Sequence, residues 1–307
     1  MIFRYKPLIL IGVALLGLSA GAFAQDNDAD DAGNAPQRKP KFHIGFYTGA
    51  YFANKYSAAA YNGYGFDVNG HQYPFSSSFM YQKIINEYGG GYGQTDYIAQ
   101  ALGVDPHQWS FTESDMPVNM HYLTTILVGF NTKLPVKKKT AIIANVNATK
   151  INVEGNFTIT TLLLNNTNNP AYNSNIKVFT ITGQEQRLQF QLGVQQILGS
   201  DDKLNFFMEA GFMGTLAKFS KNMVYINNLQ IDLTYYNNQA IYPSPGPTKV
   251  PVGFGIGAFI GAGMNVDINP KFTIQFLYTL SHEKINIGVN PTLKLQNGLG
   301  MRVYYNI

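Results

Sequence analysis

The sequence contains no cysteine, has few charged residues and holds a single tryptophan. Without cysteine the chain forms no disulfide, supports no thiolate chemistry and offers no cysteine for lipidation. Charged residues make up 13% of the chain, compared with about 25% in ordinary soluble domains. No apolar run approaches the ~20 residues that a membrane-spanning helix needs. These absences argue against a disulfide-built fold, a helical membrane protein and a typical charged soluble domain.

The first 24 residues have the pattern of a secretory signal peptide. Arg4 and Lys6 form a basic start, residues 8–18 form a short apolar core, and Ala22-Phe23-Ala24 matches the small-x-small cleavage site. We therefore predict cleavage after Ala24. An uncleaved membrane anchor is the alternative, but the apolar run is short for a spanning helix.

Residues 25–41 hold an acidic run followed by a basic, proline-containing one, which predicts a disordered periplasmic tail. The mature chain of 283 residues would carry 20 basic and 18 acidic side chains. Such a small imbalance argues against a nucleic-acid partner.

Aromatic residues are abundant, at 14%, with 20 tyrosines and 21 phenylalanines. The last nine residues, LGMRVYYNI, alternate between an apolar and a more polar face, which is the pattern of a strand between two different environments. The same alternation recurs in seven earlier segments. The eight predicted strands are residues 43–53, 118–134, 140–159, 176–198, 204–217, 250–266, 272–282 and 299–307.

The connections between these strands alternate in length. Short turns are predicted at residues 135–139, 199–203 and 267–271, and long loops at residues 54–117, 165–175, 218–249 and 283–294. Short periplasmic turns and long external loops are typical of transmembrane barrels. We therefore predict an all-β fold: a transmembrane antiparallel up-and-down β-barrel of eight strands, occupying residues 42–307 in the outer membrane.

Four further details of this barrel are predicted. Met120 and Tyr122 are predicted to face lipid with the rest of residues 118–134. In the third strand the apolar parity changes, which predicts a bulge near Thr149 or a turn at residues 154–156. The strand also exceeds the bilayer span, as does the fourth, so a hairpin is expected to project outward. A further hairpin around residues 66–79 would raise the count to ten strands.

With this pattern, strand count and loop asymmetry, the chain resembles the small bacterial outer-membrane β-barrels, broadly OmpX-like or like the porin-family proteins that include PorT. The resemblance covers residues 43–307 and carries no specific sequence motif. It implies contact with outer-membrane lipid and with the barrel-insertion machinery, which often reads a terminal aromatic residue. Here Tyr304 and Tyr305 precede a terminal Ile307.

The parity of the strands places three charged residues inside the barrel: Arg187, Glu209 and Arg302. An eight-stranded barrel is just wide enough to be filled by side chains, and buried charges need partners. We therefore predict a lumen charge cluster joining Glu209 to one or both arginines. Inward glycines of the sixth strand are expected to make room for large neighbours such as Tyr47, Tyr51, Phe207 and Tyr304.

The first long loop is rich in tyrosine and glycine, which is typical of adaptable binding surfaces. The candidate binding surface comprises Tyr61, Tyr64, Tyr88, Tyr92 and Tyr97, and a lid over the barrel mouth is the alternative. Residues 96–102 are predicted to form a short helix that begins near Asp96 and stops at Gly103.

The five histidines lack metal-ligand spacing, so neither a metal nor another cofactor is expected. His71 lies near Asp67 and residues 76–78 in sequence, but the spacing matches no nucleophile motif. We therefore predict a non-enzymatic protein with a structural or interaction role, through surface loops or as an accessory of an envelope assembly or secretion complex, with a protein partner there. A small-solute porin and a rim-sited lipid-modifying enzyme remain the two alternatives.

Overall fold

Eight long antiparallel strands close into a ring in the computed structural model, which describes residues 42–66, 71–162, 174–199, 204–234, 252–287 and 292–307. The predicted signal peptide and tail lie outside these residues. The ring strands are β1 (His43–Phe52), β4 (Thr125–Pro135), β5 (Thr140–Leu162), β6 (Ser174–Leu198), β7 (Leu204–Ile226), β9 (Val252–Asn269), β10 (Phe272–Ile285) and β11 (Lys294–Asn306).

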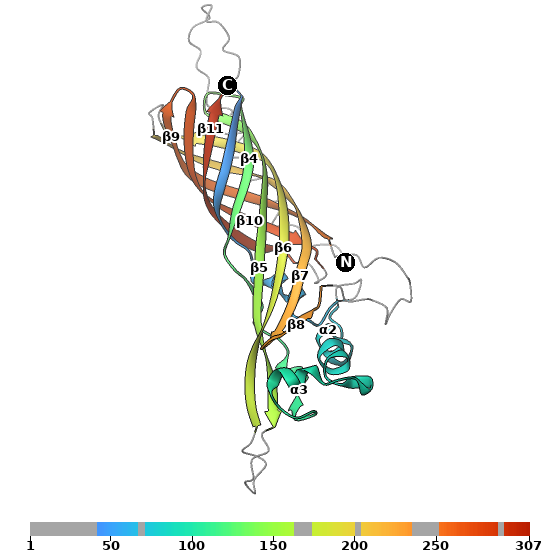
Figure 1. Ribbon diagram of the computed structural model, residues 1–307. Coiled ribbons are helices and arrows are strands. Elements are labelled where there is room, and N and C mark those ends of the chain that lie inside the picture. Colours follow the sequence, from blue (N-terminus) through green and yellow to red (C-terminus); the bar gives the residue numbers. More distant parts are fainter. Residues whose placement is uncertain (1–41, 67–70, 163–173, 200–203, 235–251, 288–291) are drawn as a thin grey trace, which may run out of the picture. The chain divides into compact units, whose positions relative to one another are not determined.

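Every neighbour pair in the ring is antiparallel, and the ring closes between the first and last strands (Figure 1). His43 lies opposite both Asn306 of β11 and Lys133 of β4. No free sheet edge is therefore left around the barrel, as a membrane-embedded sheet requires. The predicted eight-stranded barrel is confirmed, and a ten-stranded ring is wrong because the described part of residues 66–79 adds only an isolated bridge between Phe66 and Gln72.

The barrel exposes an apolar belt and buries polar side chains. Phe130, Phe212 and Ile256 point outward with 69%, 74% and 64% of their surface exposed. Alternate residues of the ring strands point inward, among them the fully buried Asn131 of β4 and Gln195 of β6. This is the reverse of a soluble barrel, and it is stable only where hydrocarbon surrounds the belt. No helix among the described residues is long and apolar enough to cross a membrane.

In strand β5 the apolar residues switch from one alternate face of the strand to the other, and the structure gives the reason. Its 23 residues alternate between buried and exposed without interruption, and its pairing with β6 has no register shift, so the predicted bulge near Thr149 or turn at residues 154–156 is wrong. The inward face holds Asn145 within the barrel and Phe157 beyond it. The side chains of β5 keep their alternation along the whole strand. The apolar face changes because the outward face contacts lipid along the barrel and water beyond it.

The irregularity lies in β7 instead. Its pairing with β6 shifts between Gln184 and Glu185, where Ser220 is the extra residue on β7. Beyond this bulge β7 continues to Ile226 and turns back into β8 (Leu229–Asp232). The sequence assigns residues 218–234 to a loop, and they form a hairpin because Val224, Ile226 and Ile231 all find a buried partner there.

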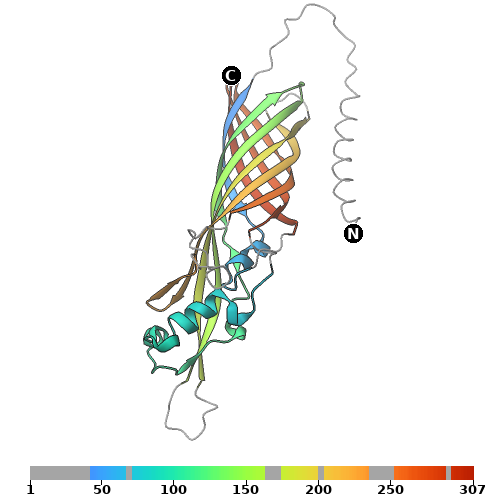
Figure 2. The ribbon, with the colours of Figure 1, turned by 90° about the vertical axis from the view of Figure 1, so that its right-hand side faces the viewer.

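Beyond one end of the ring, β5, β6 and β7 continue into a second layer of structure, visible in both views (Figures 1 and 2). We call it the distal domain: residues 54–66 and 71–122, residues 150–162 of β5, residues 174–184 of β6, and residues 219–234. Its remaining elements are η1 (Lys55–Tyr61), η2 (Phe75–Ser77), α2 (Phe79–Tyr81), the π-helical turn η3 (Gln82–Glu87), η4 (Gly91–Gly93), α3 (Tyr97–Leu102), β2 (Trp109–Ser110), η5 (Glu113–Asp115) and β3 (His121–Tyr122).

The distal domain has its own hydrophobic core. Tyr61, Ile84 and Ile98 from the first loop pack against Phe157 of β5 and Val224 of β7, and all are buried. A loop without such a core could not bury its apolar side chains, so the first long loop is a folded part of the protein.

Met120 and Tyr122 belong to this domain and not to the lipid-facing belt. Strand β4 begins only at Thr125, and a separate strand, β3, pairs His121 and Tyr122 with β5. Met120 is buried in the distal core, and Tyr122 packs against the same core. Their prediction as lipid-facing residues is therefore wrong, because apolar alternation continues across the break between β3 and β4.

The two ends of the barrel differ as predicted. Residues 136–139 connect β4 to β5, and Pro270 and Lys271 connect β9 to β10, at the end that we call the short-turn end. The distal domain lies at the opposite end, which we call the long-loop end. The β5–β6 hairpin does project there, while the tip at residues 163–173 lies outside the described residues.

Candidate functional site

One predicted lumen pair forms deep in the barrel. The two Nη atoms of Arg302 on β11 donate to the two carboxylate oxygens of Glu209 on β7, at 2.6 and 2.9 Å. Both side chains are buried. This two-pronged contact is the geometry in which a guanidinium compensates a carboxylate best, and it links strands that lie on different sides of the ring.

The surroundings of this pair are polar and interlocked. Gln195 Nε2 donates to Glu209 and exchanges hydrogen bonds with Gln275, which in turn donates to Asn265. A Cβ atom at Gly261 would lie 2.8 Å from Cγ of Glu209. A side chain at that position would therefore displace the carboxylate from Arg302.

Other inward glycines also make room for lumen side chains, although not always for the predicted ones. Gly263 on β9 faces Phe207, and Gly257 faces Glu283. The rings of Tyr47 and Tyr304 are accommodated by glycines of β1 and β11, which are Gly49 and Gly300 for Tyr47 and Gly45 for Tyr304.

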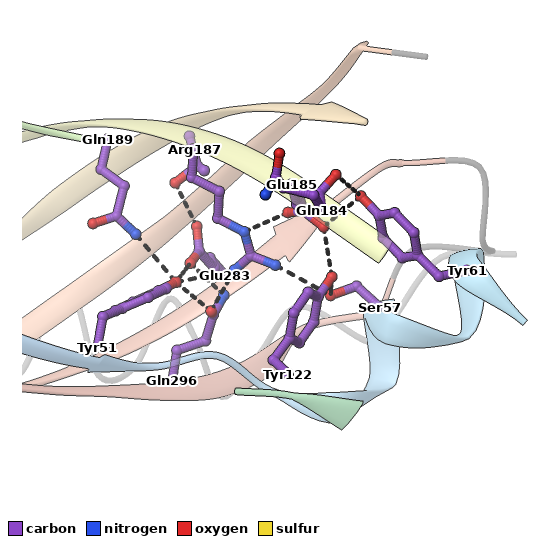
Figure 3. Close-up of polar contacts among 11 residues, drawn as sticks. Tyr51, Ser57, Tyr61, Tyr122, Gln184, Glu185, Arg187, Gln189, Glu283 and Gln296 are labelled. Carbon is purple, nitrogen blue, oxygen red and sulfur yellow. Dashed lines mark hydrogen bonds and ion pairs between the residues drawn. The ribbon is translucent and has the colours of Figure 1, made fainter. Parts of the chain in front are cut away.

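The prediction left open whether Glu209 pairs with one arginine or with both. Arg187 does not pair with Glu209 and belongs to a second network nearer the long-loop end (Figure 3). Its Nε donates to Glu185 at 2.5 Å, and both side chains are fully buried. Its Nη1 donates to Gln296 at 2.6 Å and to the Tyr51 hydroxyl at 3.0 Å. We call this set the outer network.

A second carboxylate completes the outer network. Glu283 on β10 accepts hydrogen bonds from Gln296 and from the Thr215 hydroxyl, the latter at 2.6 Å. Tyr51 donates to Gln296 and receives a hydrogen bond from Gln189. The network therefore connects β1, β6, β7, β10 and β11 across the lumen.

The outer network also holds the distal domain. The Tyr122 hydroxyl donates to Glu185 at 2.6 Å, and Arg187 Nη2 reaches Ser57 at 3.4 Å. Tyr61 stacks on Phe219 with ring centroids 4.3 Å apart. Burial, together with the Glu185 carboxylate, raises the pKa of Tyr61 and of Tyr122 well above 10, so both hydroxyls stay protonated as donors.

Sequence reasoning missed most of this network. Glu185 shares the inward parity of Arg187, two residues earlier on the same strand, and this signal was available in the sequence. Glu283 was assigned to a loop because its strand was ended too early, and Gln296 was assigned to no element because the last strand was begun too late. Tyr122 and Ser57 come from the distal domain, and no periodicity relates them to Arg187.

Buried apolar side chains also point into the lumen. One cluster contains Phe207, Leu277 and Ile151, and another contains Ile143, Met213 and Phe259. A small cavity of about 20 Å³ lies near Tyr51 and Arg302.

The five predicted loop tyrosines lie in different surroundings. Tyr61 is fully buried, so its assignment to a binding surface is wrong. Tyr64 and Tyr88 are half-buried against the distal core, and Tyr97 is exposed. Tyr92 belongs to η4, but its side chain lies outside the described residues. Hydrophobic burial has therefore drawn part of this tyrosine-rich segment inward.

Near His71 in sequence, Ser78 has a structural role. The buried Ser78 hydroxyl accepts the backbone N–H of Tyr81 and so caps α2. Asp67 lies outside the described residues. No group of three or more histidine, aspartate or glutamate side chains that could hold a metal is present in the described part of the chain.

The predicted short helix α3 is present and explains the position of the single tryptophan. Asp96 accepts the N–H of Ala99 at 2.8 Å, and Gly103 ends the helix with φ +71°. The second carboxylate oxygen of Asp96 accepts Trp109 Nε1 at 2.9 Å and the N–H of His107 at 3.2 Å. One carboxylate thus joins the helix to the strand β2 that follows.

Replacing Asp96 with alanine is expected to weaken this local structure by about 1–2 kcal/mol, because a helix cap and two further hydrogen bonds are lost. Hydrogen exchange at the amides of Ala99 and His107 measures the change. Asp105→Ala is the matched control, since its carboxylate contacts only the exposed Gln108 side chain. Equal protection of the two amides in both variants would contradict this role of Asp96.

Comparison with known proteins gives structural likeness only. No family model matches the sequence, and no curated protein matches it. Among solved structures, Neisserial surface protein A (NspA) is similar at 7% identity, with 87% of this chain and 97% of that chain covered and a TM-score of 0.38. The outer membrane protein OprG from Pseudomonas aeruginosa has 8% identity, 87% and 96% coverage and a TM-score of 0.40.

Ail, the attachment invasion locus protein of Yersinia pestis, solved in complex with the heparin analogue sucrose octasulfate, is similar at 9% identity. The match covers 87% of this chain and 98% of that chain, with a TM-score of 0.33. These neighbours are small outer-membrane β-barrels, distant in sequence. At such scores the likeness carries no argument, and the barrel assignment rests on the closed ring and the exposed apolar belt.

Proposed function

We propose that this protein is a closed outer-membrane anchor that presents the distal domain to a protein partner at the cell surface. The single observation that carries the proposal is the outer network, which both fills the barrel mouth and holds the distal domain through Tyr122 and Ser57. A barrel whose mouth is occupied in this way is suited to anchoring. A loop region with its own core is already ordered, so it loses little conformational entropy when it binds a partner.

The proposal includes export and orientation. Residues 1–24 act as the signal peptide, residues 25–41 form a periplasmic tail, and residues 42–307 form the membrane-anchored unit. The short-turn end then faces the periplasm and the distal domain faces outward, in agreement with the usual loop asymmetry of such barrels.

A protein with a closed lumen is expected to conduct no ions across the membrane. In planar lipid bilayers the refolded protein is expected to show no steady conductance, because the Glu209–Arg302 pair, the outer network and the apolar clusters lie across the path. A porin of about 16 strands, which leaves an aqueous channel, is the positive control. Steady single-channel steps from the protein itself would replace the anchoring role with the small-solute porin.

The binding role is tested by site-specific crosslinking in intact cells. A photoreactive residue at the exposed Tyr97 of the distal domain is expected to form an adduct with a protein. The matched position is Phe212, which is exposed on the lipid-facing belt and is expected to react only with lipid. If positions 97 and 212 give the same products, the distal domain does not engage a partner and the proposal fails.

A further inference from the structure

A cavity of about 600 Å³ opens at the short-turn end, away from both the outer network and the distal domain. It lies between the β4–β5 turn and the β9–β10 turn, and its lining includes Lys133, Lys139, Asp267, Thr273 and Tyr304. Its volume falls within the ~300–1,000 Å³ typical of small-molecule sites.

Among the described residues of the lining, basic side chains outnumber acidic ones. Four lysines, at positions 133 and 137–139, contribute to it, and Asp267 is the one acidic residue among the described lining residues. The Asp267 carboxylate is already engaged, accepting hydrogen bonds from the Thr273 hydroxyl at 2.6 Å and from Asn265 at 3.1 Å. It also attracts the Lys133 ammonium group.

Two buried donors in this cavity lack a matching acceptor. Lys133 points inward from β4, is only 9% exposed, and donates no hydrogen bond to any described residue. The Tyr304 hydroxyl is buried and has no hydrogen-bond partner within the described chain. Arg302 lies nearby but can only donate, so the hydroxyl proton of Tyr304 remains available. A buried polar group left without a partner is costly.

We propose that this cavity binds a phosphate-bearing anion, with Lys133 and Tyr304 as its buried donors. An ammonium group is a common point-charge partner of phosphate. A phosphate monoester carries about −1.5 to −2 charges near neutral pH and three acceptor oxygens, so one phosphate group can accept hydrogen bonds from both Lys133 and Tyr304. The site is separate from the proposed surface role, so either proposal can fail without the other.

The test uses the mature full-length protein in uncharged detergent micelles and inorganic phosphate as the probe. Phosphate is expected to produce a saturable shift of the Tyr304 amide resonance, at ionic strength held constant with sodium chloride. Lys133→Gln is expected to weaken binding about tenfold or more, and Tyr304→Phe about tenfold, as loss of a hydrogen bond to a charged ligand predicts. Tyr304→Phe removes a single oxygen atom and leaves the ring packing in place.

Lys150→Gln is the matched control, because Lys150 is an exposed lysine on β5 at the long-loop end. It is expected to bind phosphate as the unchanged protein does. Heat-dependent gel mobility verifies that each variant has a closed barrel. If no saturable shift occurs, or if the 133 and 150 variants bind equally, the site is not an anion site and the proposal is overturned.

The phosphate could come from a lipid headgroup or from a soluble compound. Repeating the titration in nanodiscs of phosphatidylcholine, with and without phosphatidylglycerol, separates these sources. If anionic lipid competes with inorganic phosphate, the apparent affinity falls and the headgroup is the natural occupant. An unchanged affinity identifies a soluble phosphate compound, and both outcomes require the same Lys133 and Tyr304 donors.

Discussion

Replacing Arg187 with leucine is expected to destabilise the folded protein by about 3–5 kcal/mol, because breaking a buried ion pair leaves its partner charge uncompensated. Glu185 would lose its 2.5 Å contact with the guanidinium while remaining fully buried. Gln296 and Tyr51 would lose a donor as well. Urea-induced unfolding in detergent micelles, followed by far-ultraviolet circular dichroism, measures the loss of free energy of unfolding.

Two further variants identify the cause of this loss. Adding Glu185→Gln to the Arg187→Leu protein removes the unpaired charge and is expected to restore most of the stability. Lys150→Leu removes a cation of the same sign from an exposed position and is expected to change stability by less than about 0.5 kcal/mol. If the double variant is as unstable as Arg187→Leu, lost packing and not the buried carboxylate explains the effect.

Replacing Tyr61 with alanine is expected to release the first loop from the barrel mouth while leaving the barrel closed. The ring of Tyr61 is fully buried, stacks on Phe219, and fits over Gly183, where a Cβ atom would lie 2.2 Å from Cδ1 of the ring. Truncating a buried aromatic side chain costs about 3–5 kcal/mol. The loss falls on the distal domain, because Tyr61 belongs to η1 and not to a ring strand.

Limited proteolysis detects this release as faster cleavage within residues 54–122, by a factor of about one hundred or more if local opening is rate-determining. Heat-dependent gel mobility is expected to remain unchanged, since the barrel strands keep their pairing. Tyr97→Ala is the matched control, because Tyr97 is an exposed tyrosine in the same domain. Equal cleavage of the two variants would show that Tyr61 does not anchor the loop.

The prediction of the strands succeeded where alternation is local. Residues 188–195 alternate so regularly that they place Gln189 and Gln191 inside and Phe190 and Leu192 outside, and the structure has them there. The helix α3 was also predicted, because Asp96 and Gly103 are signals within a few residues of the helix they bound. Such features depend on neighbours in the chain.

Errors arose where a strand with one continuous alternation runs from the barrel into the distal domain. Strand β5 keeps one inward face throughout, but this face is polar inside the barrel and apolar in the distal domain. In the sequence, this switch of the apolar residues from one face of the strand to the other resembles a bulge near Thr149. Tyr61 likewise resembles an exposed loop tyrosine, because nothing in its neighbourhood shows that Phe219 and Gly183 will meet it.

The sequence by itself determined the eight strands of the barrel, its lipid-facing belt and the inward position of Arg187, Glu209 and Arg302. These follow from a two-residue period, which any strand between lipid and a polar interior must show. Only the tertiary structure decided which charges pair: Glu209 with Arg302, and Arg187 with Glu185. Partner choice depends on the stagger of strands around the ring and on the folded first loop, and both arise from contacts between residues far apart in the chain.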